Sequence, residues 1–416
     1  MSSTGESATK LANIHDFGSK LRQPSLWGRL KDYVLWQAKL RSGERPEDFF
    51  DRGPDAAPVS INLDLTTACN YACDHCVDFD ILNKGVRYDY ERLLESLDLM
   101  WKKGLRSVIL IGGGEPTVYP KFTEVVRFLK ERDMHIAVVS NGSRLDRIQE
   151  VAHLFGPQDW VRLSLDSGTD PTFQAMHKPR QPITLEEICA GVPKVKEANP
   201  NLRMGFSFII TWKGAFTNDT QIVENIHEIV EATRLARDHQ FDYISLKPFL
   251  VRAEENNAEM VGMDDTWSSF DDVITRIRAE VDKAKELATD SFAVVESTNL
   301  RVFEQKTYRE FTQQPKNCHM QFFRQVVSPF GIFNCPVYRH VPKASMGNKE
   351  AYAGEENFLE TKKAVAQLIH GFDASHECRE VTCLYNPANW FIEDLIEHPD
   401  KLDSLEPMAE REDFFL

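Results

Sequence analysis

Short apolar runs alternate with longer amphipathic stretches along the middle of the chain. Between these runs, apolar residues recur at helical spacing, as in YERLLESLDLMWKKG and KFTEVVRFLKERD. The strand-like runs lie at residues 60–65, 107–112, 135–140, 160–165, 204–210 and 241–246. A strand followed by a helix six times predicts an α/β fold with a parallel sheet, either open or curled into a partial (β/α)6 barrel.

The same pattern divides the chain into four parts. A leader precedes the first strand, and its apolar positions between Ser25 and Arg41 predict one helix that packs on the main domain. A helix at about 265–289 and a strand at 291–297 close the main domain. The hairpin-like segment QVVSPFGIF then predicts a small α+β domain. The expected parts are an N-terminal helical leader at 1–55, the partial barrel at 56–300, the small C-terminal domain at 301–395 and an acidic surface helix or tail at 396–416.

The amino-acid composition narrows the expected cellular location and the expected binding partners of the protein. Hydrophobic residues make up 42% of the chain and charged residues 27%, as in ordinary globular proteins. No apolar run reaches the ~18 residues of a membrane span, and the N-terminus lacks a secretory signal, so we expect a cytoplasmic protein. Lys and Arg number 49 against 64 Asp and Glu, and the formal net charge of −15 argues against nucleic acid as a partner.

Three of the eight cysteines directly follow the first predicted strand. Cys69, Cys73 and Cys76 have the spacing CxxxCxxC, and in a reducing compartment clustered cysteines indicate metal ligands. Three thiolates can hold three irons of a 4Fe-4S cubane and leave the fourth iron open to another molecule. A structural zinc loop with His75 as the fourth ligand is the alternative. The position of the loop after strand one favours an active site over zinc.

A CxxxCxxC loop at this point of a six-fold strand–helix repeat resembles the radical S-adenosylmethionine (radical SAM) superfamily. The resemblance covers roughly residues 58–300 as a fold. It implies a partial (β/α)6 barrel, a 4Fe-4S cluster on the three cysteines, and S-adenosylmethionine bound to the open iron. In that family the residue before the third cysteine is usually aromatic and packs near the adenine, and here His75 takes this place.

The turn after the second strand carries the sequence GGGEPT. It matches the family's GGEP motif, which implies that Gly113, Gly114 and Glu115 bind the methionyl amino group. The chemistry is suitable, because glycines let a backbone approach a ligand and a carboxylate accepts hydrogen bonds from an ammonium group.

Further candidates for cofactor binding follow strands three and four. Asn141, in Ser-Asn-Gly, resembles the family's turn near the cofactor, although an ordinary Asn-Gly turn is nearly as good an interpretation. Strand alternation points Ser164 and Asp166 the same way, and the resemblance implies that they bind the ribose hydroxyls. Lys178 or Arg180 stands where relatives place a base that meets the cofactor carboxylate, with a solvated surface charge as the alternative interpretation.

A second group of cysteines lies near the C-terminus. Cys318, Cys335, Cys378 and Cys383 can complete a closed iron–sulfur cluster or a closed zinc site. Their layout resembles the SPASM/twitch appendages of radical enzymes, in which a hairpin and a helix carry an auxiliary 4Fe-4S cluster. The full SPASM pattern is absent because there is no CxxCxxxxxC run, so a twitch-like domain with one auxiliary cluster fits best. Cys189 falls within a predicted helix and is expected to be buried packing.

The resemblance implies a radical SAM oxidoreductase or related radical enzyme. Such an enzyme reductively cleaves S-adenosylmethionine to a 5′-deoxyadenosyl radical, using an electron donor such as flavodoxin or ferredoxin. We expect the radical to abstract a hydrogen atom from a small polar substrate, such as a sugar or aminocyclitol, for oxidation or dehydrogenation. No residue is assigned as catalytic. Polar residues at strand ends are candidates to face the substrate, namely Thr211, Ser245, Lys247 and Arg252.

Three alternatives remain open. The first is maturation of a precursor peptide, although the leader is too short for an added peptide-binding domain. The second is a radical epimerase that uses a spare cysteine. The third is an iron–sulfur or zinc scaffold without catalysis, against which the GGEP-type loop argues because a scaffold has no need of an ammonium-binding carboxylate.

Overall fold

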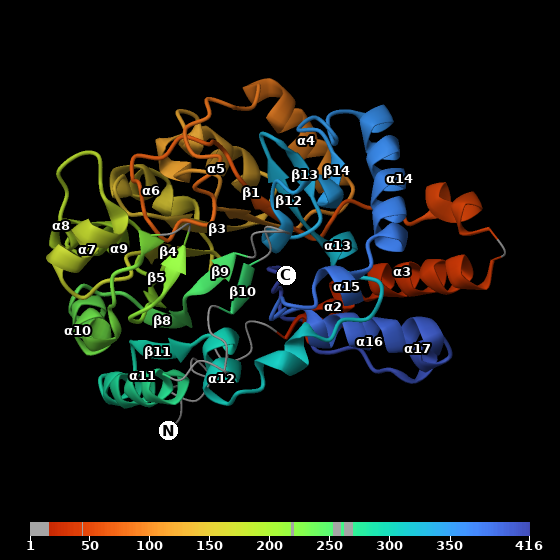
Figure 1. The fold of residues 1–416 in the computed structure, drawn as a ribbon. Helices are drawn as coiled ribbons and strands as arrows, with labels where there is room; N and C mark the ends of the chain where they lie inside the picture. The colour runs from red at the N-terminus through yellow and green to blue at the C-terminus, as the bar shows by residue number, and fades with distance from the viewer. Residues whose placement is uncertain (1–15, 44, 218–219, 253–258, 262–268) are drawn as a thin grey trace.

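One curved sheet organises the molecule (Figure 1). The computed structural model describes residues 16–43, 45–217, 220–252, 259–261 and 269–416. Ten strands form the sheet in the order β11-β8-β5-β4-β3-β2-β1-β12-β13-β14, and the strands from β11 to β12 are parallel. The strands are β1 (Ser60–Leu63), β2 (Ser107–Leu110), β3 (His135–Ser140), β4 (Trp160–Ser164), β5 (Arg203–Ile210), β8 (Tyr243–Pro248), β11 (Ala293–Glu296), β12 (Arg324–Ser328), β13 (Gly331–Phe333) and β14 (Ser345–Gly347).

Helices cover the outer face of the sheet (Figure 1). Each predicted strand–helix pair of the main domain is confirmed in type and order. Two short strand pairs lie outside the main sheet, β6 (Phe216–Thr217) with β7 (Thr220–Gln221) and β9 (Leu250–Arg252) with β10 (Glu259–Val261). The helices of this part are α4 (Tyr90–Lys102), α5 (Phe122–Lys130), α6 (Leu145–Val151), α7 (Asp170–His177), α8 (Leu185–Cys189), α9 (Val192–Ala198), α10 (Ile229–Asp238), α11 (Phe270–Lys285) and α12 (Thr298–Glu304).

Alternating side chains give the sheet two different faces. On β2, Val108 and Leu110 belong to the large core beneath the helices, whereas Ile109 lies on the inner face with Ala137 of β3. Helix α5 likewise buries one apolar face. Its residues at helical spacing, Phe122, Val125, Val126 and Leu129, are all fully buried. The expected helix at about 265–289 is α11, and the residues of the expectation before 269 lie outside the described part.

The C-terminal hairpin extends the main sheet. β12 pairs in parallel with β1, and β13 and β14 then add as antiparallel strands. Pairing with β12 covers the edge of β1, which would otherwise expose a row of unpaired backbone groups. The hairpin expected from QVVSPFGIF is therefore continuous with the barrel. The remaining helices are α13 (Met320–Phe323), α14 (Glu355–Gly371), α15 (Ala374–Glu377), α16 (Asn386–Glu397) and α17 (Lys401–Ser404).

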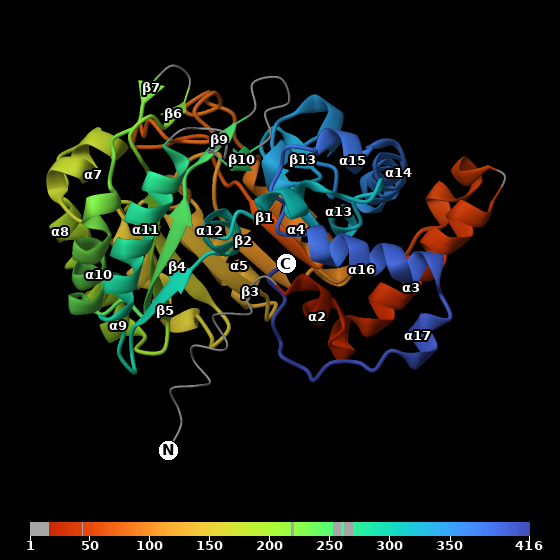
Figure 2. The same cartoon turned by 60° about the horizontal axis from the view of Figure 1, so that its bottom comes forward.

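The leader helix packs mostly on the C-terminal part. The leader forms α2 (Phe17–Leu21) and α3 (Pro24–Ser42), and Figure 2 shows α3 alongside α16. Arg41 of α3 forms a bidentate ion pair with Glu393 of α16, with Nη–Oε distances of 2.8 and 2.7 Å. The ring of Tyr33 stacks 4.6 Å from that of Phe322. The expected packing on the main domain holds in part, because Leu30 and Val34 belong to the same core as the barrel. Arg29 also donates to the backbone carbonyls of Ala57 and Lys103.

The acidic end of the chain is partly buried. Its charge predicts a surface helix or tail, but residues 414–416 (Phe-Phe-Leu) are buried. The ring of Phe415 lies 5.7 Å from that of Trp160 on the inner face of the sheet. Lys20 of α2 donates to the carbonyl of Phe415 and pairs with Asp413 at 3.1 Å. Apolar side chains among the acidic residues thus close one end of the inner face. Within the described residues, no helix has the length and apolarity to span a membrane.

Candidate active site

The first cysteine group occupies a loop after β1. Cys69, Cys73 and Cys76 are all partly buried. Asn83 fixes the start of the loop, because its Oδ1 accepts a hydrogen bond from the Cys69 amide at 3.1 Å. Burial raises the pKa of the Cys69 thiol, and burial with the nearby Asp78 charge raises that of Cys76 to about 12. Deprotonation of this loop therefore requires strong compensation, such as metal cations.

A zinc ion and a four-iron cluster would space their cysteine sulfurs differently. A tetrahedral zinc with Zn–S bonds of ~2.3 Å would hold its thiolates about 3.8 Å apart. Within the described residues, no three cysteine sulfurs of either group lie within 4.8 Å of one another. A four-iron cubane is larger than one ion and takes more widely spaced thiolates.

The GGEP-type loop lies directly against the cysteine loop. The amide of Glu115 donates to the carbonyl of Ala68 at 2.9 Å. A Cβ at Gly114 would come within 2.4 Å of the same carbonyl oxygen, so no side chain fits there. Gly113 has a φ of +67°, and its amide donates to Asp78 on the far side of the cysteine loop at 3.1 Å. The glycines thus bring the two loops into backbone contact.

The carboxylate of Glu115 joins this loop to the end of β3. Its Oε1 accepts from the Thr117 amide and hydroxyl and from Ser140 Oγ, at 2.6 to 3.0 Å. Its Oε2 accepts from the Asn141 amide at 2.7 Å. Burial raises the pKa of Glu115, although these hydrogen bonds oppose the rise. Oε2 keeps more unused accepting capacity than Oε1, and an ammonium group is a suitable donor.

Asn141 also contacts the cysteine loop. Its side-chain Nδ2 donates to Oδ1 of Asn70 at 2.9 Å, and Asn70 in turn donates to Ser143 Oγ at 2.8 Å. The turn after β3 therefore holds the segment between the first two cysteines. The structure brings together five of the residues expected to bind the cofactor or the cluster, namely Cys69, Gly113, Gly114, Glu115 and Asn141.

Asp166 and His75 are placed differently from our expectation. The Asp166 carboxylate accepts from the Ile209 amide at 2.7 Å and faces His75 Nε2 at 3.1 Å. Burial would raise the pKa of Asp166, but the hydrogen bond and charge of His75 outweigh it and lower the pKa. Asp166 thus holds the cysteine loop in this structure, and its φ of +51° is a strained value for a non-glycine residue. Ser164 is partly exposed on the inner face.

His177 is a site residue that sequence reasoning missed. It ends α7, and its Nδ1 lies 3.3 Å from Cys73 Sγ while its Nε2 lies 2.9 Å from the Leu165 carbonyl. Burial, and then the His75 charge, lower its pKa to about 4. Neighbouring Lys178 lies at the surface, where Nζ pairs with Asp74 of the cysteine loop at 2.6 Å.

The second cysteine group surrounds a small apolar cluster. Cys318, Cys335, Cys378 and Cys383 all pack against it, and it is separate from the main core. Its buried members are Tyr338, Val341, Ala344, Phe372, Ala374 and Val381. Burial, and then the other three cysteines, raise the pKa of Cys383 well above its usual range. The four thiols are therefore close enough to repel one another as thiolates.

Arg339 connects the two cysteine regions. It follows Cys335 by four residues, is buried, and pairs with Asp78 at 2.8 Å and with Asp64 at 3.2 Å. Gly112 makes room for it, because a Cβ there would lie 2.6 Å from Arg339 Nη1. Burial raises the pKa of Asp64 to about 8 although Arg339 opposes the rise. No local sequence signal links residues so far apart in the chain.

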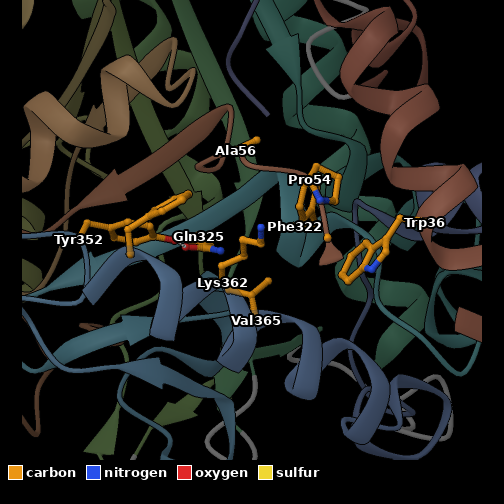
Figure 3. A pocket seen from close by; sticks show the side chains of 10 residues that line it. Trp36, Pro54, Ala56, Phe322, Gln325, Tyr352, Lys362 and Val365 are labelled. Atoms are coloured by element: carbon orange, nitrogen blue, oxygen red, sulfur yellow. Dashed lines mark hydrogen bonds between the residues drawn. The ribbon is translucent and has the colours of Figure 1, made fainter. Parts of the chain in front are cut away.

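The enclosed cavity of Figure 3 is not this site. It measures about 20 Å³ and lies between the leader, α13 and α14, lined by residues such as Trp36, Tyr352 and Val365. That volume holds about one water molecule. Cys189 is buried in the main core, as expected, and burial raises its pKa. The backbone of Arg252 ends β9, but its side chain is outside the described part.

Comparison with known families agrees with this geometry. Residues 63–229 match the model of the Radical SAM superfamily. The matched segment begins at the end of β1 and includes the cysteine loop, the GGEP-type loop and the turn after β3. Residues 63–229 therefore form a radical SAM domain, and members of that superfamily use a 4Fe-4S cluster and S-adenosylmethionine.

Curated relatives match this chain in part. An S-adenosylmethionine-dependent nucleotide dehydratase of Selenomonas ruminantium is 25% identical over 156 residues, which are 36% of this chain and 56% of that protein. A tungsten-containing aldehyde ferredoxin oxidoreductase cofactor-modifying protein of Pyrococcus furiosus is 34% identical over 33% of this chain and 36% of its own length. The mycofactocin maturase MftC of Mycobacterium tuberculosis is 33% identical over 29% and 30%. The chain thus spans between about a third and about half of these relatives' length.

Solved structures share the fold. Streptococcus suis SuiB bound to S-adenosylmethionine superposes with a TM-score of 0.53 at 13% identity, over 73% of this chain and 65% of that one. A structure of native anSMEcpe with bound AdoMet gives a TM-score of 0.50 at 14% identity, over 76% and 83%. The predicted α/β partial barrel is confirmed at the level of fold.

Proposed function

We propose that this protein reductively cleaves S-adenosylmethionine and uses the resulting radical to abstract a hydrogen atom from a small polar substrate. One observation carries the proposal. The Glu115 carboxylate is buried and fixed by the turn after β3, while the amide of the same residue donates to the cysteine loop. An acceptor for ammonium is thereby held beside three cysteine thiols, and a scaffold protein has no need of that combination.

The roles follow from the contacts of each residue. Cys69, Cys73 and Cys76 would hold the cluster, and Glu115 would bind the methionyl ammonium group. Gly113 and Gly114 would let the backbone approach the cofactor. When bound, the cluster and S-adenosylmethionine supply the electron and the organic radical for hydrogen abstraction. The chain itself orients these groups and excludes water.

The remaining candidates have weaker support. Ser164 has a hydroxyl on the inner face that suits a ribose. Asp166 and His75 are better suited to supporting the cysteine loop, because they contact each other. Lys178 would have to leave Asp74 to reach the cofactor carboxylate, whereas Arg180, whose charge lowers the pKa of Cys69 against burial, lies nearer to the cluster.

We further propose that the second cysteine group binds an auxiliary 4Fe-4S cluster in a twitch-like domain over residues 301–395. Four thiolates leave no open iron, so this cluster would transfer electrons or organise the fold. Arg339 would hold it in a constant position relative to the first cluster. An auxiliary cluster that accepts one electron from the substrate radical would give an oxidised product. A flavodoxin or ferredoxin in the cytoplasm would supply the electrons.

Peptide maturation is the second candidate function. MftC is named a maturase, and SuiB has been solved with a precursor peptide, SuiA. The dehydratase relatives are instead named for nucleotides. The polar and cationic inner face of the sheet, described below, favours a small anionic substrate. A radical epimerase would require a cysteine facing the substrate, and zinc in the purified protein would identify a zinc scaffold.

Iron content and electron paramagnetic resonance (EPR) test the proposal. Anaerobically reconstituted protein should bind about eight irons, and the reduced cluster signal should change when S-adenosylmethionine is added. Replacing Cys378 and Cys383 by Ala should leave about four irons and keep the cofactor-dependent change. Zinc at either site in anaerobically purified protein, or an EPR signal that S-adenosylmethionine does not alter, would contradict the assignment.

A further inference from the structure

Three serines form a row across neighbouring strands of the sheet. Ser164 of β4 pairs in register with Ser207 of β5, and Ser207 pairs with Ser245 of β8. Their strand neighbours Leu163 and Leu246 belong to the core beneath the outer helices, so the serines occupy the inner face. Adjacent strands lie ~4.8 Å apart, and the row therefore presents three hydroxyls over about 10 Å.

An arginine lies one step below this row. Arg162 shares the inner face with Trp160, and its guanidinium lies 5.3 Å from that ring. Its Nε is buried and has no hydrogen-bond partner. Across the sheet, the Tyr243 ring leans over Gly205, where a Cβ would lie 2.2 Å from it, and narrows the space around the guanidinium.

A lysine lies above the row. Lys247 of β8 is partly buried, and its Nζ donates to Ser207 Oγ at 3.3 Å. It forms no ion pair with a carboxylate in the described part of the chain. Burial, and then the charge of Arg162, lower the pKa of Lys247 well below its usual range, while Asp166 opposes this effect.

Two cations held together without a carboxylate partner are costly to a folded protein. Buried charges are normally paired, and burial without a partner destabilises the fold. Elsewhere in the described part of the chain, the buried cations Lys20 and Arg339 are paired with carboxylates, Lys20 with Asp413 and Arg339 with two aspartates. The unpaired cations are therefore better explained by a ligand than by packing.

We infer that Arg162, Lys247 and the hydroxyls of Ser207 and Ser245 bind the phosphate group of a phosphorylated small-molecule substrate, while Ser164 keeps its proposed role at the ribose. This inference rests on the proposed function and names the class of its substrate. A phosphate dianion matches two cations and offers enough oxygens for the hydroxyls as well. A single carboxylate would satisfy only one of the cations. The site lies between the rings of Trp160 and Phe415 on one side and the cysteine loop on the other. With the phosphate bound there, the rest of the substrate would extend towards the cluster.

Pyrophosphate binding to the reconstituted holoprotein tests the inference. Calorimetry with S-adenosylmethionine present should detect the binding of pyrophosphate. Arg162→Gln and Lys247→Met should each weaken this binding about ten- to a hundredfold. Arg234→Gln on α10 and Lys283→Met on α11 are matched controls, because they make the same changes at exposed residues. These controls should bind pyrophosphate like the unchanged protein. Malonate, which presents two carboxylates, should bind more weakly.

Parallel measurements separate this inference from the proposed function. Because the two cations lack carboxylate partners in the described part of the chain, both variants should keep or raise the thermal midpoint of the ligand-free protein and still bind S-adenosylmethionine. Tight binding of malonate without pyrophosphate would overturn the phosphate assignment. If neither variant changes the affinity for pyrophosphate and both lower the thermal midpoint, Arg162 and Lys247 have a structural role instead. Loss of S-adenosylmethionine cleavage in the unchanged protein would instead contradict the proposed function, whatever binds at the inner face.

Discussion

At the scale of single residues, Glu115 provides a direct prediction. Glu115→Gln keeps the size of the side chain but removes the charge that an ammonium group would meet. We expect S-adenosylmethionine to bind about ten- to a hundredfold more weakly, because a hydrogen bond to a charged group contributes about 1.5–3 kcal/mol. Iron content should not change, since Glu115 is no cluster ligand. Equilibrium binding measures the effect, and Glu124→Gln, at a partly exposed carboxylate of α5, is the control. Equal affinity in the two variants would remove Glu115 from the site.

Residues on one short loop could be predicted from sequence, and residues brought together by the sheet could not. The cysteine loop and Glu115 stand in continuous motifs. Arg162 left only a faint signal, as the one charge within the strand WVRLSL, on the face of Ser164. His177 gave no signal, because its contact with Cys73 depends on where α7 ends. Asp166 was expected to bind ribose, but its carboxylate is used by a backbone amide and a histidine.

At the scale of elements, the contact between the GGEP-type loop and the segment after β13 can be isolated. Gly112→Ala would strain a φ of +57° and displace Arg339. Gly85→Ala is the matched control, because Gly85 has a φ of +73° but open space around its Cβ position. Backbone strain of about 1–3 kcal/mol applies to both, so Gly112→Ala should lower the thermal midpoint further.

The same pair of variants in an Arg339→Ala background completes this test. With the guanidinium removed, the two glycine variants should lower the thermal midpoint by the same amount, because only the shared backbone strain remains. A persistent difference between them would mean that Arg339 does not explain the glycine at position 112. Thermal unfolding of each reconstituted protein gives the comparison.

The elements themselves were largely predictable, and their partners less so. Periodicity is a local property, so the six strands and the helices between them appear where the pattern indicates. The apolar face of α3 predicts that other elements pack against it but not which ones. In the structure these are mainly α16 and α13. The sequence likewise did not predict that the hairpin joins β1 or that Phe415 is buried. Contacts between residues hundreds of positions apart leave no local pattern.

At the scale of the whole molecule, charge is distributed unevenly. The chain carries a formal net charge of −15, yet Arg162 and Lys247 lie on the inner face with no carboxylate partner among the described residues. An acidic exterior repels nucleic acid, whereas a cationic interior can hold one small anion. The leader, α16 and the second cysteine group form the other end of the molecule, where Glu393 links Arg41 to His319 beside Cys318.

Formation of 5′-deoxyadenosine tests the central claim most directly. Reconstituted protein, reduced with dithionite and given S-adenosylmethionine, should release 5′-deoxyadenosine that mass spectrometry detects. The triple variant Cys69→Ala, Cys73→Ala, Cys76→Ala should release none, because no open iron remains to bind the cofactor. The double variant Cys378→Ala, Cys383→Ala should still release it. Continued release from the triple variant would contradict the account.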